Sequence, residues 1–172
     1  AITPKTAPHI FNFLKKYPST TLKASGQDVG LFAGQEGNSE AGHFNIGAGR
    51  VVEQDLVRIS RAIDDGTFFK NEAFAQARHH SETHHSTVHV IGLLTNGQSA
   101  HAPPEHLYAL LEYFRQHDCH DVALHLFTDG RDSSPHSAIT HLKRLRKYMK
   151  NSERIATIMG RFYAMDRNKL WE

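Results

Sequence analysis

The stretch Val122-Ala123-Leu124-His125-Leu126-Phe127 decides the fold, because this apolar run leads directly into the polar turn Thr128-Asp129-Gly130-Arg131-Asp132. A short apolar run that ends at turn residues predicts a buried strand. Two runs of the same kind, at 88–94 and 155–159, lie on either side of it along the chain. Helical patterns separate the three runs, and strands that alternate with helices form βαβ units. The sequence therefore predicts an α/β fold in which helices flank a parallel sheet.

Helices are predicted where apolar residues recur at helical spacing. The patterns between the strands cover about 103–117 and 135–150. Upstream, an apolar face at 53–65 predicts another helix, and 68–77 predicts a second, shorter one. Together with the strands, these helices make residues 54–172 one α/β layer.

The first part of the chain has a different rhythm. Thr6 is placed to cap a helix that runs to Lys16, and 20–24 predicts a short strand. A glycine-rich loop follows at 25–37. The change of pattern predicts a domain boundary, with a first domain at 1–53 and the α/β layer after it.

The composition is that of a globular protein, because 39% of the 172 residues are hydrophobic and 22% are charged. A net charge of +2 is too balanced to indicate nucleic-acid binding, and no apolar run approaches the length of a membrane span. Cys119 is the only cysteine, which excludes an internal disulfide and favours a cytoplasmic location. The chain begins with Ala1 and stops inside a charged segment at Glu172, so we expect a fragment of a longer protein.

The predicted sheet brings three polar loops together. In a parallel sheet the carboxyl ends of the strands share one edge, and ligands bind there. The loops after the three strands lie at 95–101, 128–132 and 160–167. They carry four side chains that we expect to converge on one pocket: His101, Arg131, Arg161 and Arg167. Because arginine forks match carboxylate and phosphate oxygens, this pocket predicts a small ligand with several negative charges.

Each of these residues also has a simpler interpretation. A single arginine in a charged loop is more often a solvated surface residue. Asp132 is placed either to pair with an arginine, to accept a hydrogen bond from a substrate hydroxyl, or to cap the helix whose first turn holds Pro135. The similar behaviour of three consecutive strand ends favours the pocket.

Ser39 lies in the small-residue run Gly37-Asn38-Ser39-Glu40-Ala41-Gly42-His43. A hydroxyl at a loop-to-helix turn is exposed, and the free N–H groups of the turn favour an anion beside it. A nucleophile that receives a phosphoryl group needs both. A turn that only redirects the chain is the alternative. His43 lies four residues on, where it either influences Ser39 or bonds to the backbone.

Four histidines gather within the segment His79-His80-Ser81-Glu82-Thr83-His84-His85. On a helix, His80 and His84 would share a face and could chelate a metal ion. The segment lacks an apolar frame, however, so we interpret it as a solvated linker.

Several blocks of the chain occur together, and in this order, in one known family. The first are Gly37-Asn38-Ser39-Glu40-Ala41-Gly42-His43 and Asn45-Ile46-Gly47-Ala48-Gly49-Arg50. The later ones are Phe127-Thr128-Asp129-Gly130-Arg131-Asp132 and Gly160-Arg161-Phe162-Tyr163-Ala164-Met165-Asp166-Arg167. They resemble the phosphoserine region and the two arginine-bearing substrate loops of cofactor-independent phosphoglycerate mutases. The similarity extends over essentially the whole chain.

The resemblance implies a reaction and a set of roles. Such enzymes interconvert 3-phosphoglycerate and 2-phosphoglycerate in glycolysis and gluconeogenesis. They belong with metal-dependent enzymes related to alkaline phosphatase and usually use two manganese ions. Ser39 is then the nucleophile and a metal ligand, and the substrate-binding residues are Arg131, Asp132, Arg161 and Arg167. The family also places a histidine after the first strand. A one-residue insertion puts His101 at that position, and without it Ala100 takes the place.

The resemblance covers only about the N-terminal third of such an enzyme, so most metal ligands are missing. It implies that 1–53 is a fragment of a phosphatase-like domain and that 54–172 is a partial transferase domain. We expect phosphoglycerate as the partner, neither nucleic acid nor a membrane, a monomer at full length, and no activity from this chain alone. Asn96 stands where the family has an acid, which keeps a non-catalytic anion-binding module as an alternative. A plain phosphatase that uses Ser39 is a third possibility.

Overall fold

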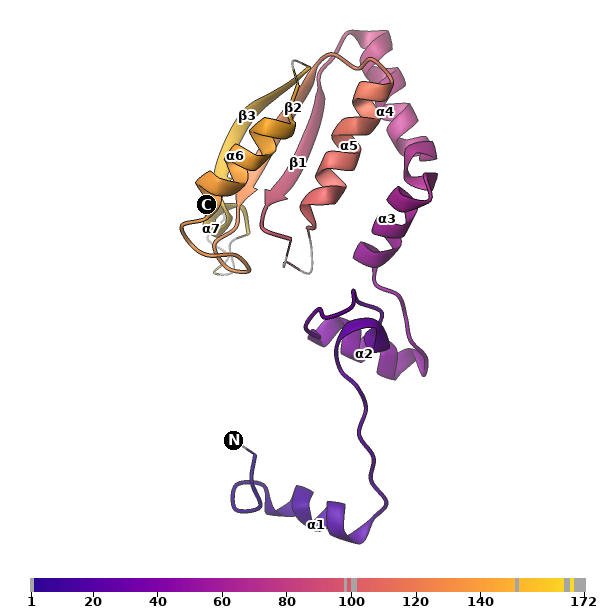
Figure 1. Cartoon of the computed structure of the whole chain (residues 1–172), viewed down its shortest axis with the longest axis vertical. Helices are drawn as coiled ribbons and strands as arrows, with labels where there is room; N and C mark the ends of the chain where they lie inside the picture. Colours follow the sequence, from indigo (N-terminus) through magenta and orange to yellow (C-terminus); the bar gives the residue numbers. More distant parts are fainter. Residues whose placement is uncertain (1, 98, 100–101, 151, 166–167, 169–172) are drawn as a thin grey trace. The chain divides into compact units, whose positions relative to one another are not determined.

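The computed structural model describes residues 2–97, 99, 102–150, 152–165 and 168 (Figure 1). The chain divides into two compact units, Ala1–Val52 and Glu53–Glu172. The assignment of the first to a phosphatase-like domain and of the second to a transferase domain stays a prediction.

The second unit is built on a parallel sheet in the order β1-β2-β3. Its strands are β1 (Val88–Leu94), β2 (Val122–Thr128) and β3 (Glu153–Gly160). The helices α5 (Pro104–Gln116) and α6 (Ala138–Tyr148) connect them. Two successive right-handed crossovers in the same direction put both helices on one face of the sheet, as Figure 1 shows. The predicted α/β fold, with helices flanking a parallel sheet, is confirmed.

The core lies between the sheet and these two helices. Leu124 and Leu126 of β2 are completely buried and belong to one apolar cluster with Leu111 of α5 and Leu145 of α6. Because side chains alternate along a strand, the residue between the two leucines, His125, points to the opposite face. The sheet therefore has a packed face and a face that α5 and α6 leave uncovered.

Three further helical segments precede the sheet: α3 (Asp55–Asp64), η2 (Thr67–Lys70) and α4 (Glu72–His84). The helix predicted at 53–65 is confirmed. The prediction at 68–77 was too short, because Asn71 caps a helix that starts at Glu72 and continues to His84. The interpretation of the histidine segment as a linker was therefore wrong. Asn71 Oδ1 caps the start of this helix by accepting a 2.9 Å hydrogen bond from the Ala73 N–H. Within the polar stretch, Arg78 Nη1 donates to Glu82 Oε1 at 2.6 Å, a pair one helical turn apart that supports the helix there.

The first unit contains α1 (Pro8–Lys16), η1 (Gly26–Val29) and α2 (Ser39–Ala48). Thr6 does not cap α1, because its hydroxyl bonds within the preceding turn to Thr3. Residues 20–24, all described, form no strand, since an isolated extended segment has no partner with which to pair.

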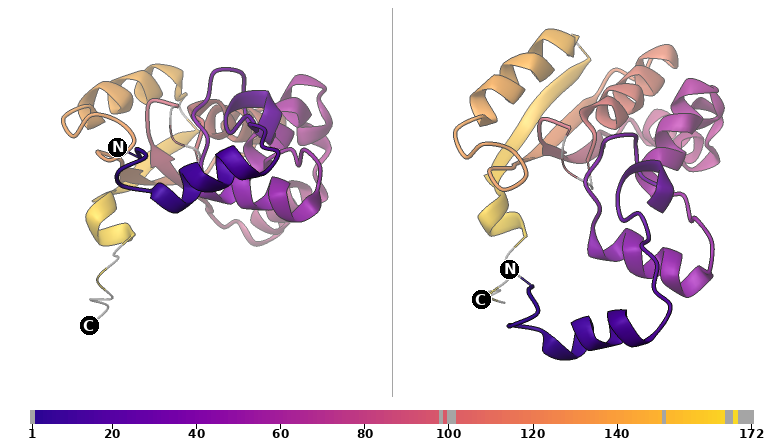
Figure 2. Two further views of the ribbon diagram at one scale, coloured as in Figure 1. Left: turned by 90° about the horizontal axis from the view of Figure 1, so that it is seen from below. Right: turned by 60° about the horizontal axis from the view of Figure 1, so that its bottom comes forward.

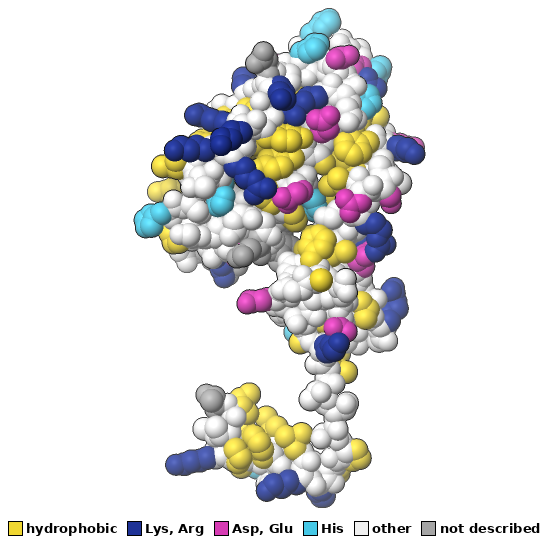
Figure 3. Space-filling view, viewed as in Figure 1, with side chains coloured by type: hydrophobic (Ala, Val, Ile, Leu, Met, Phe, Trp, Pro, Cys, Tyr) yellow, Lys and Arg dark blue, Asp and Glu magenta, His cyan; other side chains and the backbone are white. Residues whose placement is uncertain are grey.

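The helix α1 carries an apolar face that stays exposed within its own unit (Figure 3). Ile10, Phe13, Leu14 and Tyr17 are each more than half exposed. Among the described residues, no helix is long and apolar enough to cross a membrane.

Candidate functional site

The loop after β2 is built around the carboxylate of Asp129. Its Oδ1 accepts hydrogen bonds from the backbone N–H groups of Arg131 (3.0 Å) and Asp132 (3.1 Å). Its Oδ2 accepts from the backbone N–H (2.8 Å) and the hydroxyl (2.9 Å) of Ser133. Gly130 supplies the positive φ of 96° that this tight loop requires. The carboxylate thus fixes the backbone from which the Arg131 side chain extends.

The loop after β3 is tied to the same carboxylate. Arg161, the first residue of α7 (Arg161–Ala164), donates through Nη1 to Asp129 Oδ1 at 2.6 Å and to Asp132 Oδ2 at 2.9 Å. The side chains are 12% exposed for Arg161 and 0% for Asp129. A charged pair that is this well enclosed keeps one geometry, because each partner supplies the hydrogen bonds that the other needs.

The loop after β1 completes the connection. The Thr95 hydroxyl donates to Asp129 Oδ2 at 3.2 Å, and the Ser99 hydroxyl donates to Asp132 Oδ2 at 3.0 Å. Figure 2 shows the loop that follows β2 at the same end of the sheet as α7. The three strand-end loops therefore meet at the carboxyl edge, as the parallel sheet predicted.

Electrostatics keep both carboxylates ionised. Burial alone would raise the pKa of Asp129, but the donors from Arg131, Asp132, Ser133 and Arg161 outweigh it and hold this pKa well below its usual range. The Arg161 guanidinium likewise lowers the pKa of Asp132, and the hydrogen bond to Asp132 raises the pKa of Arg161. Arg161 thus serves as a fixed, charged part of the loop framework.

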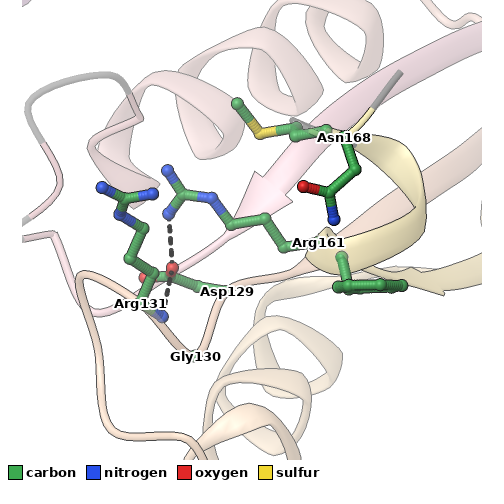
Figure 4. A pocket seen from close by; sticks show the side chains of 7 residues that line it. Asp129, Gly130, Arg131, Arg161 and Asn168 are labelled. Atoms are coloured by element: carbon green, nitrogen blue, oxygen red, sulfur yellow. Dashed lines mark hydrogen bonds and ion pairs between the residues drawn. The ribbon is translucent and has the colours of Figure 1, made fainter. Parts of the chain in front are cut away.

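Arg131 differs from Arg161 in having an exposed side chain. Among the residues that the structure describes, none pairs with its guanidinium. Figure 4 shows the guanidinium groups of Arg131 and Arg161 on the same side of Asp129, pointing into one space. Two neighbouring forks, of which one has no internal anion, make a site for carboxylate or phosphate oxygens.

A pocket of about 310 Å³ opens beside these two arginines. It is lined by Asp129, Gly130, Arg131, Arg161, Phe162, Met165 and Asn168. This volume is at the small end of the range for ligand sites, and it combines charged groups with apolar side chains from α7. The pocket suits a small anionic molecule with a short carbon skeleton.

The other predicted pocket residues have different outcomes. His101 and Arg167 lie outside the described residues. Of the alternatives for Asp132, the pairing with an arginine is observed, and the partner is Arg161. Asp132 does not cap α6, which starts at Ala138 with Ser137 in the cap position.

Asp129 and its hydroxyl partners were not singled out in the sequence. An available signal was an aspartate directly after a strand, followed by glycine and then serine, which is typical of a turn in which the carboxylate binds the backbone N–H groups that follow it. Nothing local indicates that this aspartate also contacts Arg161, which lies 32 residues further along the chain.

Ser39 is the first residue of α2 in the other unit. Asn38 caps the helix by accepting a 2.8 Å hydrogen bond from the Ala41 N–H, so the cap position does not depend on Ser39. The Ser39 side chain is exposed. Gly37 is required just before it, because a Cβ there would lie 1.7 Å from the carbonyl oxygen of Ala24.

His43 binds to the first turn of α2. Its Nδ1 lies 2.6 Å from the carbonyl oxygen of Ser39 and 3.1 Å from the Ser39 hydroxyl oxygen. A carbonyl oxygen only accepts hydrogen bonds, so Nδ1 must carry the proton. In this arrangement Nδ1 has no lone pair with which to take a proton from Ser39. Of the two alternatives for His43, the backbone-bonded one is observed.

The residues around Ser39 do not form a manganese centre. Within the described part of the chain, no group of three or more His, Cys, Asp or Glu side chains could hold a metal ion together. His80 and His84 share a face of α4, with ring centroids 4.4 Å apart, and no third such ligand joins them among the described residues. The residues present therefore do not fit the two manganese ions that the resemblance implies.

Comparisons with known proteins agree with the resemblance. A family model described as "BPG-independent PGAM N-terminus" matches residues 59–172. The chain is 45% identical over its whole length to a 2,3-bisphosphoglycerate-independent phosphoglycerate mutase of Acetivibrio thermocellus, and it covers 34% of that relative. A relative with the same name from Chloroflexus aggregans is 51% identical over 96% of the chain, which covers 31% of that relative.

A solved structure of Leishmania mexicana phosphoglycerate mutase, determined at low cobalt concentration, superposes with a TM-score of 0.79 at 28% identity. The match covers 95% of this chain and 31% of that one. The chain thus spans about a third of the length of the relatives it matches. On the strength of the family model, which matches well over half of its residues, the chain belongs to the family of N-terminal parts of bisphosphoglycerate-independent phosphoglycerate mutases.

Proposed function

We propose that this chain binds phosphoglycerate at the Arg131–Arg161 pocket. We further propose that it supplies Ser39 as the phosphoryl acceptor of a mutase that interconverts 3-phosphoglycerate and 2-phosphoglycerate in the cytoplasm during glycolysis. The observation that carries the proposal is the pair of neighbouring guanidinium groups. Arg161 is fixed by two carboxylates, and Arg131 is exposed and has no partner among the residues that the structure describes. Membership of the mutase family gives this anion pocket its substrate class.

The pocket explains how such a substrate is held. Phosphoglycerate carries a carboxylate and a phosphate, which has a charge of about −1.5 to −2 at neutral pH. Arg131 provides a full fork for one of these groups, and Arg161 adds the N–H groups that its two carboxylate partners leave free. Further positive charge would come from Arg167 and His101, which the resemblance assigns to the same pocket.

The proposed transfer is a double displacement at phosphorus. The Ser39 oxygen forms a bond to phosphorus while the bond to the substrate oxygen breaks, and the hydroxyl proton of Ser39 passes to the departing glycerate oxygen. The glycerate then turns in the arginine pocket. Its other hydroxyl oxygen forms a bond to phosphorus while the bond to the Ser39 oxygen breaks, and the proton of that hydroxyl returns to Ser39. His43 does not activate Ser39 in the observed arrangement, because its Nδ1 already carries a proton. We therefore propose that this chain binds the substrate without turning it over.

A non-catalytic anion-binding module is the second candidate. It is favoured by the contrast between an assembled pocket and the lack of a metal donor set among the described residues. A plain serine phosphatase is the third candidate. Such an enzyme need not hold the rest of its substrate in place, so it would not require two fixed arginine loops.

The test combines binding and turnover on the 172-residue chain with Mn²⁺. We expect saturable binding of 3-phosphoglycerate in isothermal titration calorimetry, no 2-phosphoglycerate in an enolase-coupled assay, and no phosphate on Ser39 by mass spectrometry. The Ser39→Ala variant should bind equally well. Turnover by the wild-type chain would refute the separation of binding from chemistry, and absence of binding would refute the pocket.

A further inference from the structure

The uncovered face of the sheet carries a pair of histidines on neighbouring strands. His89 lies on β1 and His125 on β2, on the face opposite to the one that α5 and α6 cover. The Nδ1 atom of His89 is 2.8 Å from the Nε2 atom of His125, and the two rings are stacked with centroids 5.1 Å apart. His89 is exposed and His125 is half-buried.

A third side chain orients this pair. The Nδ1 atom of His125 lies 2.9 Å from the hydroxyl of Thr157 on β3, so the contacts run across all three strands. A histidine whose one ring nitrogen is held by a hydrogen bond presents its other nitrogen in a fixed direction, which is the usual arrangement of metal-binding histidines. Here the Nε2 of His125 is directed at His89.

We propose that His89 and His125 form a binding site for a divalent transition-metal ion with tetragonal geometry, Cu²⁺ or Ni²⁺. Imidazole suits both ions, and square-planar or tetragonal sites select them. With metal–nitrogen bonds of about 2.0–2.1 Å, two nitrogens at a right angle are about 2.9 Å apart, whereas tetrahedral ligands are about 3.3 Å apart. The observed 2.8 Å is a hydrogen-bond length that is also close to the right-angle spacing, so the nitrogens need not move apart to hold an ion. When the ion replaces the hydrogen bond, both rings turn so that their lone pairs face it. The proton held between the rings moves from Nδ1 to Nε2 of His89, and water fills the remaining positions.

The surrounding charges do not oppose a cation. Asp121 and Arg154 lie near the same end of the sheet and pair with each other, so their charges largely cancel. The site uses neither arginine of the phosphoglycerate pocket, because β1 and β2 are parallel and His89 lies near the amino end while Arg131 follows the carboxyl end. The proposal is therefore independent of the proposed mutase function.

The chain provides its own control in His80 and His84 of α4, which also share a face but are helical neighbours with ring centroids 4.4 Å apart. Figure 3 shows histidine side chains at the surface near the end of α4, where they can also attract metal ions. The double variant His80→Asn/His84→Asn removes this competing pair and leaves the sheet pair intact. His89→Asn and His125→Asn each remove one histidine of the sheet pair and leave His80 and His84 intact.

The experiment is titration of the whole chain with Cu²⁺ alone, followed by electron paramagnetic resonance at one equivalent and by calorimetry. We expect one tight site with two coordinated imidazole nitrogens. Thr157→Val removes only a partner that orients His125, so it should weaken Cu²⁺ binding by roughly 10–100-fold. His89→Asn and His125→Asn each remove a ligand, so each should weaken Cu²⁺ binding by more than that. Circular dichroism checks that each variant is folded. The His80→Asn/His84→Asn variant should retain the site. Loss of the site in that double variant, or its persistence in both His89→Asn and His125→Asn, would overturn the proposal.

Discussion

The loop after β2 and the start of α2 both present polar groups at a turn, yet they are built very differently. Asp129 is completely enclosed and receives six hydrogen bonds, which come from all three strand-end loops. Ser39 is exposed, and within the described part of the chain its hydroxyl has a hydrogen-bond partner only in His43 of its own helix. Asp129 thus holds the strand-end loops of the candidate pocket in place in advance, whereas the proposed chemistry of Ser39 would need groups that its own turn does not supply.

The largest expected effect comes from removing the centre of the pocket. Asp129→Ala removes one of the two carboxylates that hold Arg161 and leaves several N–H groups of the loop without an acceptor. The free energy of unfolding of the second unit should therefore fall by about 3–5 kcal/mol. Urea denaturation measures this loss. The exposed Asp55, which pairs with Arg58, is the control, and Asp55→Ala should change stability by less than about 1 kcal/mol. Equal effects of the two substitutions would contradict the special role of Asp129.

Acid should destabilise the pocket through the same carboxylate. The pKa of Asp129 is lower in the folded chain than in the unfolded one, so its contribution is fully present above the ordinary value of about 3.9. That contribution is lost as the pH falls further towards the folded value. Urea denaturation between pH 6 and pH 3 should show a steeper loss for the wild type than for Asp129→Asn. Because the pKa of Asp132 is also lowered, Asp132→Asn is needed to separate the two. Parallel curves for wild type and Asp129→Asn would exclude this linkage.

Substitution of Arg131 should separate binding from stability. Arg131→Ala removes an exposed cation that pairs with no described residue, so stability should change by less than about 0.5 kcal/mol. Loss of charged hydrogen bonds worth about 1.5–3 kcal/mol should weaken 3-phosphoglycerate binding by roughly 10–100-fold. Arg58, exposed on α3, is the matched control, and Arg58→Ala should bind normally. Calorimetry measures the affinity, and normal affinity in Arg131→Ala would place the anion elsewhere.

The start of α2 should show smaller effects. Asn38→Ala removes the side-chain cap of this helix and should cost about 1 kcal/mol in the first unit. Ser39→Ala removes only an exposed hydroxyl, so stability should change by less than about 0.5 kcal/mol. Thermal unfolding followed by circular dichroism distinguishes them. A larger loss in Ser39→Ala than in Asn38→Ala would show that the hydroxyl has a structural role.

The parts of the fold that sequence predicts are those with a local signal. The three strands are apolar runs between turns, and their parallel order places the loops that carry Arg131 and Arg161 at one edge. The segment 20–24 has the residues of a strand, but a strand needs a partner, and that requirement is not local. Residues 79–85 look like a linker because they are polar, whereas α4 continues through them to His84, with Arg78 and Glu82 paired one turn apart.

The site shows the same limit. The arginines are recognisable as single residues at strand ends. Asp129 organises them through contacts with Thr95 and Arg161, more than thirty residues away in each direction, and these exist only once the sheet has formed. The state of His43 also required coordinates, because the contact with the Ser39 carbonyl decides which nitrogen carries the proton.

The central claim is that the chain binds phosphoglycerate through its preformed arginine pocket without help from Ser39. The most direct test is the dissociation constant of 3-phosphoglycerate for the wild type, Arg131→Ala and Ser39→Ala, measured by calorimetry under one set of conditions. We expect Arg131→Ala to bind roughly 10–100-fold more weakly and Ser39→Ala to bind like the wild type. Equal binding by the wild type and Arg131→Ala, or a loss in Ser39→Ala as large as that in Arg131→Ala, would contradict it.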